Sequence, residues 1–508
     1  MLRQMRLPLV KELLLCGLSA ILLILSFPNA NLWLLAWFGF VPLFFSLNNK
    51  SLKQAFALFF IAGVIFWSGV IYWLVHVTLP GTIVLILYLA LYFGIFGLII
   101  RPFTRNSNRY TLILIPVIWV CLEYLRGKLF TGFPWALLGY SQYLNLWVIQ
   151  IADITGVWGV SFLVMLVNVL LVEIIWAAKN KLKPRFKKAV LSLVLILALI
   201  LLYGYYRLRP EPVAAASAPL KVCVIQGNIQ QDLKWVPENN GYIIKKYLYL
   251  SSRALKEKPD LIIWPEAALP AVLEDEPQYY QKVCDFSKSM HTPLLFGAVT
   301  RRGGLYYNSA LLLSGKGELL GRYDKLHLVP FGEYVPLKNI FSFLQTIAPI
   351  GDIAAGREYA IFEVPSHKPK VSLATLICFE DLFPELSREF VKNGAQILVN
   401  ITNDAWYMHT SAPYQHLQAS VLRAVENRRP LVRSANTGIS GFIAPTGKII
   451  SLVRDKAGRE IFSDGFLTRD IKIGRHQLSF YTRFGDVFIF ICVLLILYVI
   501  IAARKGVR

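Results

Sequence analysis

Residues 189–203 read AVLSLVLILALILLY, a run in which aliphatic side chains fill almost every position. A helix built from this run has no polar face, so it does not resemble an amphipathic helix on the surface of a soluble protein. A helix that crosses a bilayer needs about 20 mostly apolar residues, and the apolar stretch around this run, residues 188–206, is close to that length. The run therefore predicts a membrane-spanning helix.

Comparable apolar stretches occur throughout the first two hundred residues and once more near the C-terminal end. They cover residues 12–28, 31–47, 54–77, 80–100, 110–125, 157–178 and 484–503. The whole chain is 56% hydrophobic and only 17% charged, which excludes a disordered protein and does not fit an ordinary soluble one. We therefore expect about eight transmembrane helices, seven of them in a membrane domain that covers residues 1–206.

Lysine and arginine residues gather at the ends of alternate apolar stretches. These basic residues are Arg3, Arg6, Lys11, Lys50, Lys53, Arg101, Arg105, Arg109, Lys179, Lys181, Lys183, Arg185, Lys187, Lys188, Arg504, Lys505 and Arg508. The intervening loops carry only Arg126 and Lys128. Because basic residues are enriched in cytoplasmic loops, we expect both ends of the chain to be cytoplasmic and residues 207–483 to lie outside.

The net charge is strongly positive, with 53 lysine and arginine residues against 31 aspartate and glutamate residues. Such a balance can indicate a nucleic-acid partner. Here, however, much of the excess lies in the predicted cytoplasmic flanks, where membrane topology explains it. We therefore expect no nucleic-acid partner.

Residues 207–219, RLRPEPVAAASAP, form a linker rich in proline and alanine. After it, short apolar segments such as LKVCVIQG, DLIIWPE and AQILVNIT alternate with amphipathic helical patterns such as PYQHLQASVLRAVENRR. This alternation predicts a layered α/β domain over residues 220–475. The domain is followed by the expected C-terminal transmembrane helix at 484–503.

Three of the six cysteines, Cys223, Cys284 and Cys378, lie in the predicted outer region. An odd number means that at least one of them is a free thiol or pairs with another chain. The sequence leaves open whether Cys223 and Cys284 form a disulfide.

Three polar residues stand at the ends of apolar segments in this domain, namely Glu266, Lys325 and Cys378. A cysteine, a glutamate and a lysine can together supply a thiol nucleophile, a base and a cation that stabilises an oxyanion. Each residue alone also has an ordinary explanation: Glu266 as a solvated cap at a strand end, Lys325 as a surface lysine, and Cys378 as a packed thiol. Sequence spacing does not bring the three together.

The strings WPEAALP (264–270), YDKLHLVPFGEYVP (323–336) and LICFED (376–381) resemble the three catalytic blocks of the nitrilase superfamily, which has an α-β-β-α sandwich fold. With the predicted spans and the string NDAWY (403–407), essentially the whole chain resembles the apolipoprotein N-acyltransferase family, the membrane-anchored branch that completes bacterial lipoprotein maturation.

The resemblance implies roles for individual residues. Cys378 matches the nucleophile, Glu266 the general base and acid, and Lys325 the oxyanion-stabilising residue. Further matches are Glu333, Phe379 and Glu380 as supporting residues and Trp235, Asn403, Trp406 and Tyr407 as substrate-binding residues. One departure is Phe379, because well-known members have tyrosine directly after the nucleophile; its backbone N–H remains available to an oxyanion.

The implied reaction transfers a fatty acyl chain from a phospholipid, through a thioester on Cys378, to the N-terminal amine of S-diacylglyceryl-cysteine on an apolipoprotein. It needs no cofactor or metal. The expected setting is the bacterial inner membrane, with a monomeric, multi-pass enzyme whose catalytic domain faces the periplasm. The main alternative is a membrane-tethered amidase or thioesterase that releases free acid.

Other functional classes fit less well. A cysteine–histidine pair would have to use His327 or His416, and neither matches a cysteine-protease pattern. The histidines form no HExxH motif and the cysteines no CxxC motif. Asp153 and Glu173, in or near the sixth apolar stretch, could mark a transport path, but a transporter rarely devotes half its length to an outer α/β domain.

Overall fold

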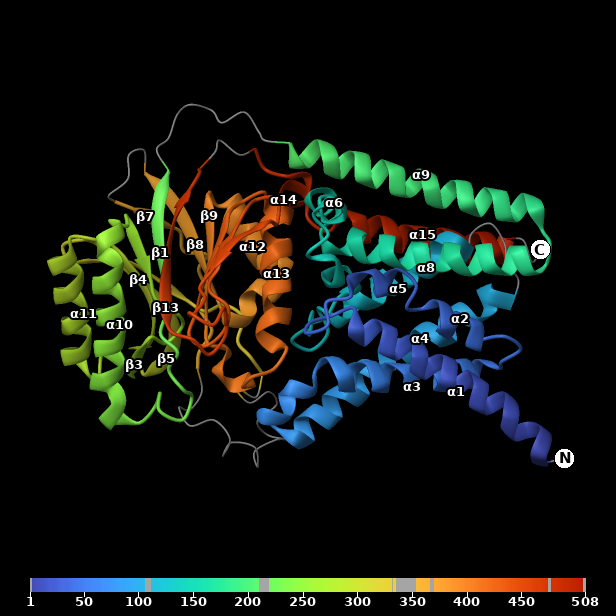
Figure 1. Cartoon of the computed structure of the whole chain (residues 1–508), viewed down its shortest axis with the longest axis horizontal. Helices are drawn as coiled ribbons and strands as arrows, with labels where there is room; N and C mark the ends of the chain where they lie inside the picture. Colours follow the sequence, from blue (N-terminus) through green and yellow to red (C-terminus); the bar gives the residue numbers. More distant parts are fainter. Residues whose placement is uncertain are drawn as a thin grey trace. The chain divides into compact units, whose positions relative to one another are not determined.

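A computed structural model describes residues 2–105, 111–209, 219–330, 332–334, 353–365, 370–473 and 477–505. The chain forms two compact units (Figure 1). The helical unit comprises Met1–Arg209 and Phe484–Arg508, and the sandwich unit comprises Pro210–Arg483.

The helical unit contains long helices joined by short turns. Its elements are α1 (Leu2–Leu25), η1 (Trp33–Trp37), α2 (Val41–Ser46), α3 (Leu52–Val70), η2 (Tyr72–His76), α4 (Leu79–Arg105), α5 (Thr111–Arg126), η3 (Leu138–Gln142), α6 (Leu146–Ile149), α7 (Ala152–Thr155), α8 (Val157–Lys179), α9 (Lys183–Leu208) and α15 (Val487–Lys505). Ser51 caps α3 by accepting a hydrogen bond from the backbone N–H of Gln54, whose side chain in turn accepts from the N–H of Ser51.

Four helices of the described part of the chain are long and apolar enough to cross a membrane. They are Leu52–Val70, Leu79–Phe103, Val157–Lys179 and Lys183–Leu208. Shorter apolar helices cover Trp33–Ser46, Leu146–Thr155 and Val487–Ala502. The expectation of eight spans is therefore supported only for these four.

The expected span at 31–47 is not one continuous helix. It forms η1 and the six-residue α2, with Pro42 near the start of α2. Proline has no N–H for a helical hydrogen bond, so it starts a helix more readily than it continues one. The expected span at 110–125 forms α5, which has 16 residues and is shorter than the length of about 20 that a bilayer needs.

Aromatic rings and close backbone contacts fill the core of the helical unit. Phe40 contacts the rings of Phe93 and Trp119, with centroids 6.0 and 4.9 Å away. The side chain of Asn168 in α8 accepts a hydrogen bond from the N–H of Phe40 at 2.9 Å and donates to the carbonyl of Ala36 at 2.8 Å. A polar side chain thereby satisfies the backbone groups left unpaired where η1 and α2 are interrupted.

Asp153, one of the two acidic residues considered for a transport path, makes a structural contact. Its carboxylate accepts hydrogen bonds from Tyr203 Oη at 2.7 Å and Arg207 Nε at 2.9 Å. These bonds join α7 to the end of α9.

The sandwich unit contains two sheets. The first has the strand order β13-β1-β2-β4-β5-β6, with β3 paired to β4, and the second has the order β12-β11-β10-β9-β8-β7. The strands are β1 (Leu220–Gln226), β2 (Leu261–Ile263), β3 (Leu269–Val272), β4 (Leu294–Arg302), β5 (Leu305–Leu313), β6 (Leu319–Asp324), β7 (Phe362–Val364), β8 (Val371–Ile377), β9 (Ile397–Thr402), β10 (Leu431–Ala435), β11 (Gly441–Ile443), β12 (Ile449–Leu452) and β13 (Gly465–Ile471).

Helices cover the outer face of each sheet, which gives four layers in the order α-β-β-α (Figure 1). The helices are α10 (Asn240–Ala254), α11 (Pro277–Met290), α12 (Pro384–Lys392) and α13 (Ala412–Asn427), with the short α14 (Phe480–Phe484) and the 3-10 turns η4 (Pro237–Asn239), η5 (Leu255–Glu257), η7 (Cys378–Leu382) and η8 (Asp404–Tyr407). In α10, Ile243, Tyr247, Leu250 and Ala254 are buried at helical spacing against the first sheet.

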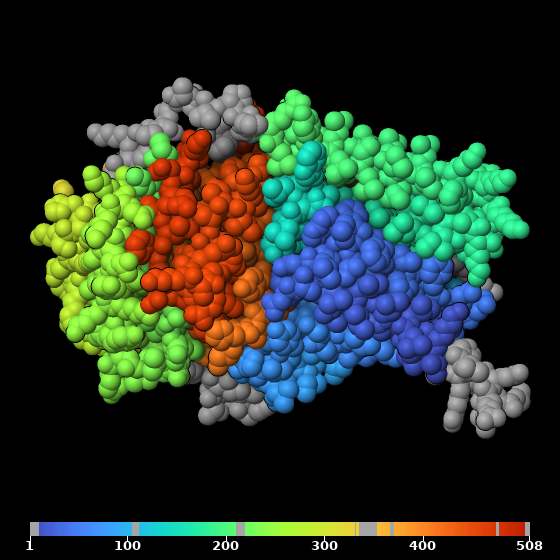
Figure 2. Space-filling view, in the orientation of Figure 1, coloured from blue at the N-terminus to red at the C-terminus, as the bar shows by residue number. Residues whose placement is uncertain are grey.

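The ends of the sandwich sequence meet in one sheet. Strand β13 pairs antiparallel with β1 along seven residues, from Leu220↔Ile471 to Gln226↔Gly465. Figure 2 shows orange-red atoms of the C-terminal part of the sandwich unit beside yellow-green atoms of its N-terminal part. The pairing closes the unit on itself.

The two sheets are joined by a hydroxyl group. Ser434 in β10 lies within hydrogen-bonding distance of the carbonyl oxygens of Ile225 in β1 and Ile263 in β2, at 3.0 and 3.2 Å. The central strands of both sheets run parallel to their neighbours, β1 to β2 and β8 to β9 to β10. Residues that follow these strands therefore emerge at strand carboxyl ends, where α/β sheets usually form their sites.

All six cysteines are free thiols in the structure. Cys223 and Cys284, whose pairing the sequence left open, therefore do not form a disulfide with each other.

Candidate active site

Cys378 is the first residue after β8 and begins η7. Its backbone has a φ of +53°, a left-handed conformation that costs a non-glycine residue roughly 1–2 kcal/mol. Its carbonyl oxygen accepts hydrogen bonds from Asn400 Nδ2 at 3.0 Å and His416 Nε2 at 3.2 Å. The neighbouring elements thus hold the turn in a conformation that the residue itself disfavours.

Glu266 lies in the loop that follows β2, and only 7% of its surface is exposed. Its Oε1 accepts a hydrogen bond from Asn308 Nδ2 at 2.7 Å. The loop passes directly over Gly297 in β4, where a Cβ would come within 2.7 Å of the Cα of Glu266. Gly297 therefore provides the space in which this carboxylate is placed.

Lys325 follows β6 and is almost completely buried, with 1% exposed. Its Nζ lies 2.9 Å from Glu333 Oε2 and 3.9 Å from Glu266 Oε1. Burial acts to lower the pKa of Lys325, but Glu333 and Glu266 outweigh burial and hold that pKa above its usual value. The lysine is consequently a permanent cation between two carboxylates.

Asn308 connects the two carboxylates on either side of the lysine. Its Nδ2 donates to Glu266 Oε1 at 2.7 Å and to Glu333 Oε1 at 2.9 Å. Glu333 also accepts a hydrogen bond from the N–H of Val329 at 2.8 Å. Glu333, which the sequence predicted as a supporting residue, therefore contacts Lys325 directly and shares Asn308 with Glu266.

The thiol of Cys378 is influenced by both groups. Burial and the charge of Glu266 raise the pKa of the Cys378 thiol, and the nearby ammonium of Lys325 only partly offsets them. The structure thus brings Cys378, Glu266 and Lys325 together electrostatically. A thiol in this setting is neutral at rest, so it must lose its proton to a base as it attacks.

Glu380 connects the nucleophile turn to the loop after Lys325. Its carboxylate accepts hydrogen bonds from the N–H groups of Leu326 at 2.7 Å and Ile377 at 2.7 Å, and from Tyr323 Oη at 2.8 Å. Burial raises the pKa of Glu380 to about 7. The residue therefore fixes two backbone segments relative to each other.

Phe379, the departure from the family pattern, is 7% exposed. Its ring contacts Phe383 with a centroid distance of 5.1 Å and His327 at 6.1 Å. The side chain is therefore part of an aromatic cluster. His327 belongs to the same cluster, since the centroid of its ring lies 3.8 Å from that of Phe383.

Four charged residues beneath the nucleophile form a cluster that sequence reasoning missed. We call Asp381, Asp404, His416 and Arg433 the charge cluster. His416 Nδ1 lies 2.9 Å from Asp404 Oδ1 and its Nε2 lies 2.8 Å from Asp381 Oδ1. Arg433 contacts the same two carboxylates at 3.2 Å each. Two cations and two anions, all buried, thus balance one another.

The charge cluster keeps its histidine protonated. Burial and Arg433 act to lower the pKa of His416, but Asp381 and Asp404 outweigh them and raise it to about 9. Both aspartates have lowered pKa values, because His416 and Arg433 outweigh the effect of burial. Both ring nitrogens of His416 are thus engaged by carboxylates and the Cys378 carbonyl, which does not suit a base for a cysteine–histidine pair.

The predicted substrate-binding residues lie in two neighbouring loops. Asn403 donates to Gln231 Oε1 at 2.9 Å and accepts from Asn436 Nδ2 at 2.9 Å, so it connects the loops. Trp406 is 44% exposed, while Trp235 and Tyr407 are partly buried. The structure gives Asn403 a structural contact and leaves Trp406 accessible.

Sequence reasoning also missed Lys234, the neighbour of Trp235. Its side chain is 1% exposed and its Nζ donates to the backbone carbonyl of Glu266 at 3.0 Å. A lysine next to a tryptophan in a polar loop carries no local signal that it is buried.

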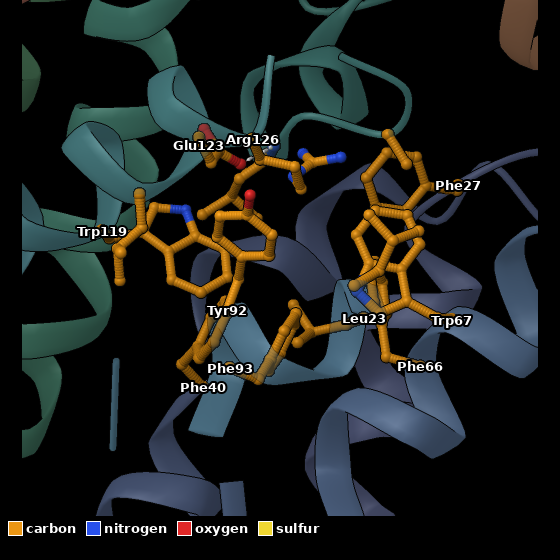
Figure 3. Close-up of a pocket in the computed structure, with 14 residues that line it drawn as sticks. Leu23, Phe27, Phe40, Phe66, Trp67, Tyr92, Phe93, Trp119, Glu123 and Arg126 are labelled. Carbon is orange, nitrogen blue, oxygen red and sulfur yellow. Dashed lines mark hydrogen bonds between the residues drawn. The ribbon is translucent and has the colours of Figure 1, made fainter. Parts of the chain in front are cut away.

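A separate cavity lies within the helical unit (Figure 3). Aromatic side chains surround it, with Glu123 and Arg126 on one wall. Glu123 Oε1 accepts from the N–H of Leu138 at 2.7 Å, and Arg126 donates to the carbonyls of Phe133 and Trp135 at 2.7 and 2.8 Å. The space is about 20 Å³, enough for a water-sized molecule. Both charged residues serve to hold the loop after α5.

Residues 221–475, which form most of the four-layer sandwich, match the Carbon-nitrogen hydrolase family model. Residues 19–170 match the model described as Apolipoprotein N-acyltransferase N-terminal domain.

Among curated relatives, the apolipoprotein N-acyltransferase of Geobacter metallireducens is 42% identical over 504 residues, covering 95% of this chain and 93% of the relative. That of Chlorobaculum tepidum is 31% identical, covering 96% of each. A solved amidase from Nesterenkonia AN1 is 18% identical, with a TM-score of 0.40 over 54% of this chain and 96% of that one. The chain belongs to the apolipoprotein N-acyltransferase family, and it is an acyltransferase.

Proposed function

We propose that this protein transfers a fatty acyl chain from a membrane phospholipid to the α-amino group of S-diacylglyceryl-cysteine at the N-terminus of an apolipoprotein. The observation that carries the proposal is the buried arrangement of Lys325 between Glu266 and Glu333, with Cys378 in the electric field of both Glu266 and Lys325. Family membership supports the acceptor class.

In the first half-reaction, Cys378 Sγ attacks the ester carbonyl carbon of the phospholipid while its proton passes to Glu266. The carbonyl oxygen of the ester becomes an oxyanion, which the ammonium of Lys325 and the backbone N–H of Phe379 stabilise. One such donor is typically worth roughly 3–4 kcal/mol. The carbon–oxygen bond then breaks, Glu266 returns the proton to the departing glycerol oxygen, and a lysophospholipid leaves.

In the second half-reaction, the α-amine of the acceptor attacks the thioester carbonyl. An α-amino group has a pKa near 8, so part of it is neutral and nucleophilic at pH 7. Glu266, again ionised, takes one proton from the attacking nitrogen and passes it to the departing sulfur. An amide bond forms, the carbon–sulfur bond breaks, and the thiol of Cys378 is restored.

The burial of the site supports transfer to an amine in place of water. Glu266 and Lys325 are 7% and 1% exposed, while Cys378 remains partly accessible. The base is therefore largely shielded from bulk water, which disfavours activation of water against the thioester. The alternative of an amidase or thioesterase is not favoured, because the relatives that match along almost the whole chain are acyltransferases.

The helices support a membrane setting for both lipid substrates. Four are long and apolar enough to cross a bilayer, and the basic residues of alternate loops favour cytoplasmic chain ends. The proposed enzyme is therefore a protein of the bacterial inner membrane, with the sandwich unit on the periplasmic side. We propose that it acts as a monomer.

The test is the mass of the purified protein after exposure to phospholipid alone. We expect an adduct of one acyl group, labile to hydroxylamine, on the peptide that contains Cys378, and its transfer to a diacylated lipopeptide added afterwards. Cys378→Ala should abolish both steps, whereas Cys284→Ala, a matched change outside the site, should retain them. Free fatty acid without amide product would contradict the proposal.

A further inference from the structure

Lys234 is a buried cation for which the proposed reaction has no use. It lies in the loop after β1 with 1% of its surface exposed. Among the described residues its ammonium forms no direct ion pair, and its one side-chain hydrogen bond goes to the main-chain carbonyl of Glu266 at 3.0 Å. Burying a charge without a carboxylate partner costs free energy, so we asked what Lys234 contributes to the site at this position.

The contact fixes the backbone from which the Glu266 carboxylate extends. The next residue, Ala267, has a φ of +45°, a conformation that non-glycine residues disfavour. Gly297 approaches the same loop from β4. Lys234 thus holds the loop from one side while Gly297 leaves room for it on the other.

The charge of Lys234 also balances the site. Two carboxylates, Glu266 and Glu333, share one ammonium, that of Lys325. Lys234 supplies a second positive charge, and its ammonium interacts electrostatically with both Glu266 and Cys378. A positive charge here favours the ionised forms of Glu266 and Cys378.

We propose that Lys234 is a positioning residue that holds the backbone of Glu266 and supplies the second positive charge that makes ionisation of Cys378 accessible. The expected effect of Lys234 on acyl transfer rests on the proposed function. The expected effect of Lys234 on the reactivity of the Cys378 thiol does not depend on any lipid.

A pH dependence follows. Burial lowers the pKa of Lys234 to about 8, although Glu266 and Cys378 act to raise it. The titratable and charged groups around it are Glu266 after β2, Cys378 after β8, and Lys325 and Glu333 behind Glu266. Tyr407 of η8 interacts with both Cys378 and Glu266. The ammonium of Lys234 is charged below about pH 8 and neutral above it. Above about pH 8, Lys234 should therefore no longer favour ionisation of the Cys378 thiol.

The experiment measures alkylation of Cys378 by iodoacetamide in the full-length protein, followed by peptide mass mapping, from pH 6 to 10. We expect Lys234→Met to slow alkylation at pH 7 by about tenfold, equivalent to one pKa unit of the thiol. Lys245→Met, an exposed lysine of α10, is the matched control and should leave the rate unchanged. Lys234→Arg should restore the rate at pH 7 and retain it above pH 8.

The possible outcomes distinguish a failure of the role proposed for Lys234 from a failure of the proposed function. Equal alkylation rates in wild type and Lys234→Met, with the Tm unchanged, would overturn the role of Lys234 and leave the proposed function intact. Absence of an acyl adduct in wild type would refute the proposed function, while the alkylation rates would still decide the role of Lys234. Normal acyl-enzyme formation in Lys234→Met with loss of amide formation alone would also overturn the inference, because it would assign the lysine to the amine step.

Discussion

His416 donates a hydrogen bond of 3.2 Å to the main-chain carbonyl oxygen of Cys378. The same ring is held between Asp381 and Asp404, at 2.8 and 2.9 Å. The conformation of the nucleophile turn therefore depends on a charged ring from α13. Replacing that ring tests the relationship directly.

His416→Asn should destabilise the sandwich unit by about 3 kcal/mol or more, because removing one member of a buried charge cluster leaves the others uncompensated. Thermal unfolding in detergent, followed by tryptophan fluorescence, measures the change in Tm. His291→Asn, a change at an exposed histidine, is the control and should alter Tm little. Similar Tm values for the two variants would refute the importance of the cluster.

The stability of the wild type should also fall at alkaline pH. The pKa of His416 is about 9 in the folded protein, against about 6.5 in an unfolded chain. Its contribution is fully present below about pH 6.5 and is lost as the pH rises through 9, a loss of about 3 kcal/mol. Unfolding curves of wild type and His416→Asn between pH 6 and 10 should converge, and parallel curves would contradict this assignment.

Lys325→Met should slow formation of the acyl-enzyme by about 10²–10³-fold, because it removes the ammonium that faces the developing oxyanion. Single-turnover measurement of the Cys378 adduct separates this step from amide formation. Lys316→Met changes an exposed lysine of the same sheet region and should react normally. An unchanged acylation rate in Lys325→Met would assign the lysine a purely structural role.

Gly297→Ala should impair activity through the position of Glu266. The added Cβ would lie 2.6 Å from the backbone nitrogen of Ala267, so the loop must move, at a cost of about 1–3 kcal/mol. Gly241→Ala is the matched control, since a Cβ there meets nothing within 4 Å. We expect a lower kcat in Gly297→Ala only, and equal kcat values would show that the loop tolerates displacement.

Local pattern is sufficient to predict the most apolar strands, such as β1 and β8, and the residues that follow them. LKVCVIQG forms β1 and LATLIC ends β8 at the nucleophile, because buried parallel strands are continuous apolar runs. Apolar composition alone does not locate interruptions in a helix. The segment at 31–47 is as apolar as its neighbours, yet it breaks between η1 and α2.

The charge cluster and Lys234 could not be predicted in the same way. Asp404, His416 and Arg433 belong to different elements, and their contacts arise only when η8, α13 and β10 pack together. One local signal exists: Arg433 stands inside the apolar strand PLVRSAN, and an arginine that is buried requires partners. No comparable signal accompanies Lys234.

The Ser434 hydroxyl, which touches the carbonyls of both Ile225 and Ile263, has a mechanical consequence. Ile263 leads into the loop of Glu266, while the neighbouring Arg433 supports the turn of Cys378 through the aspartates. Proton acceptor and sulfur are thus parts of one rigid frame. Movement of one sheet against the other would therefore change the spacing between the Glu266 loop and the Cys378 turn.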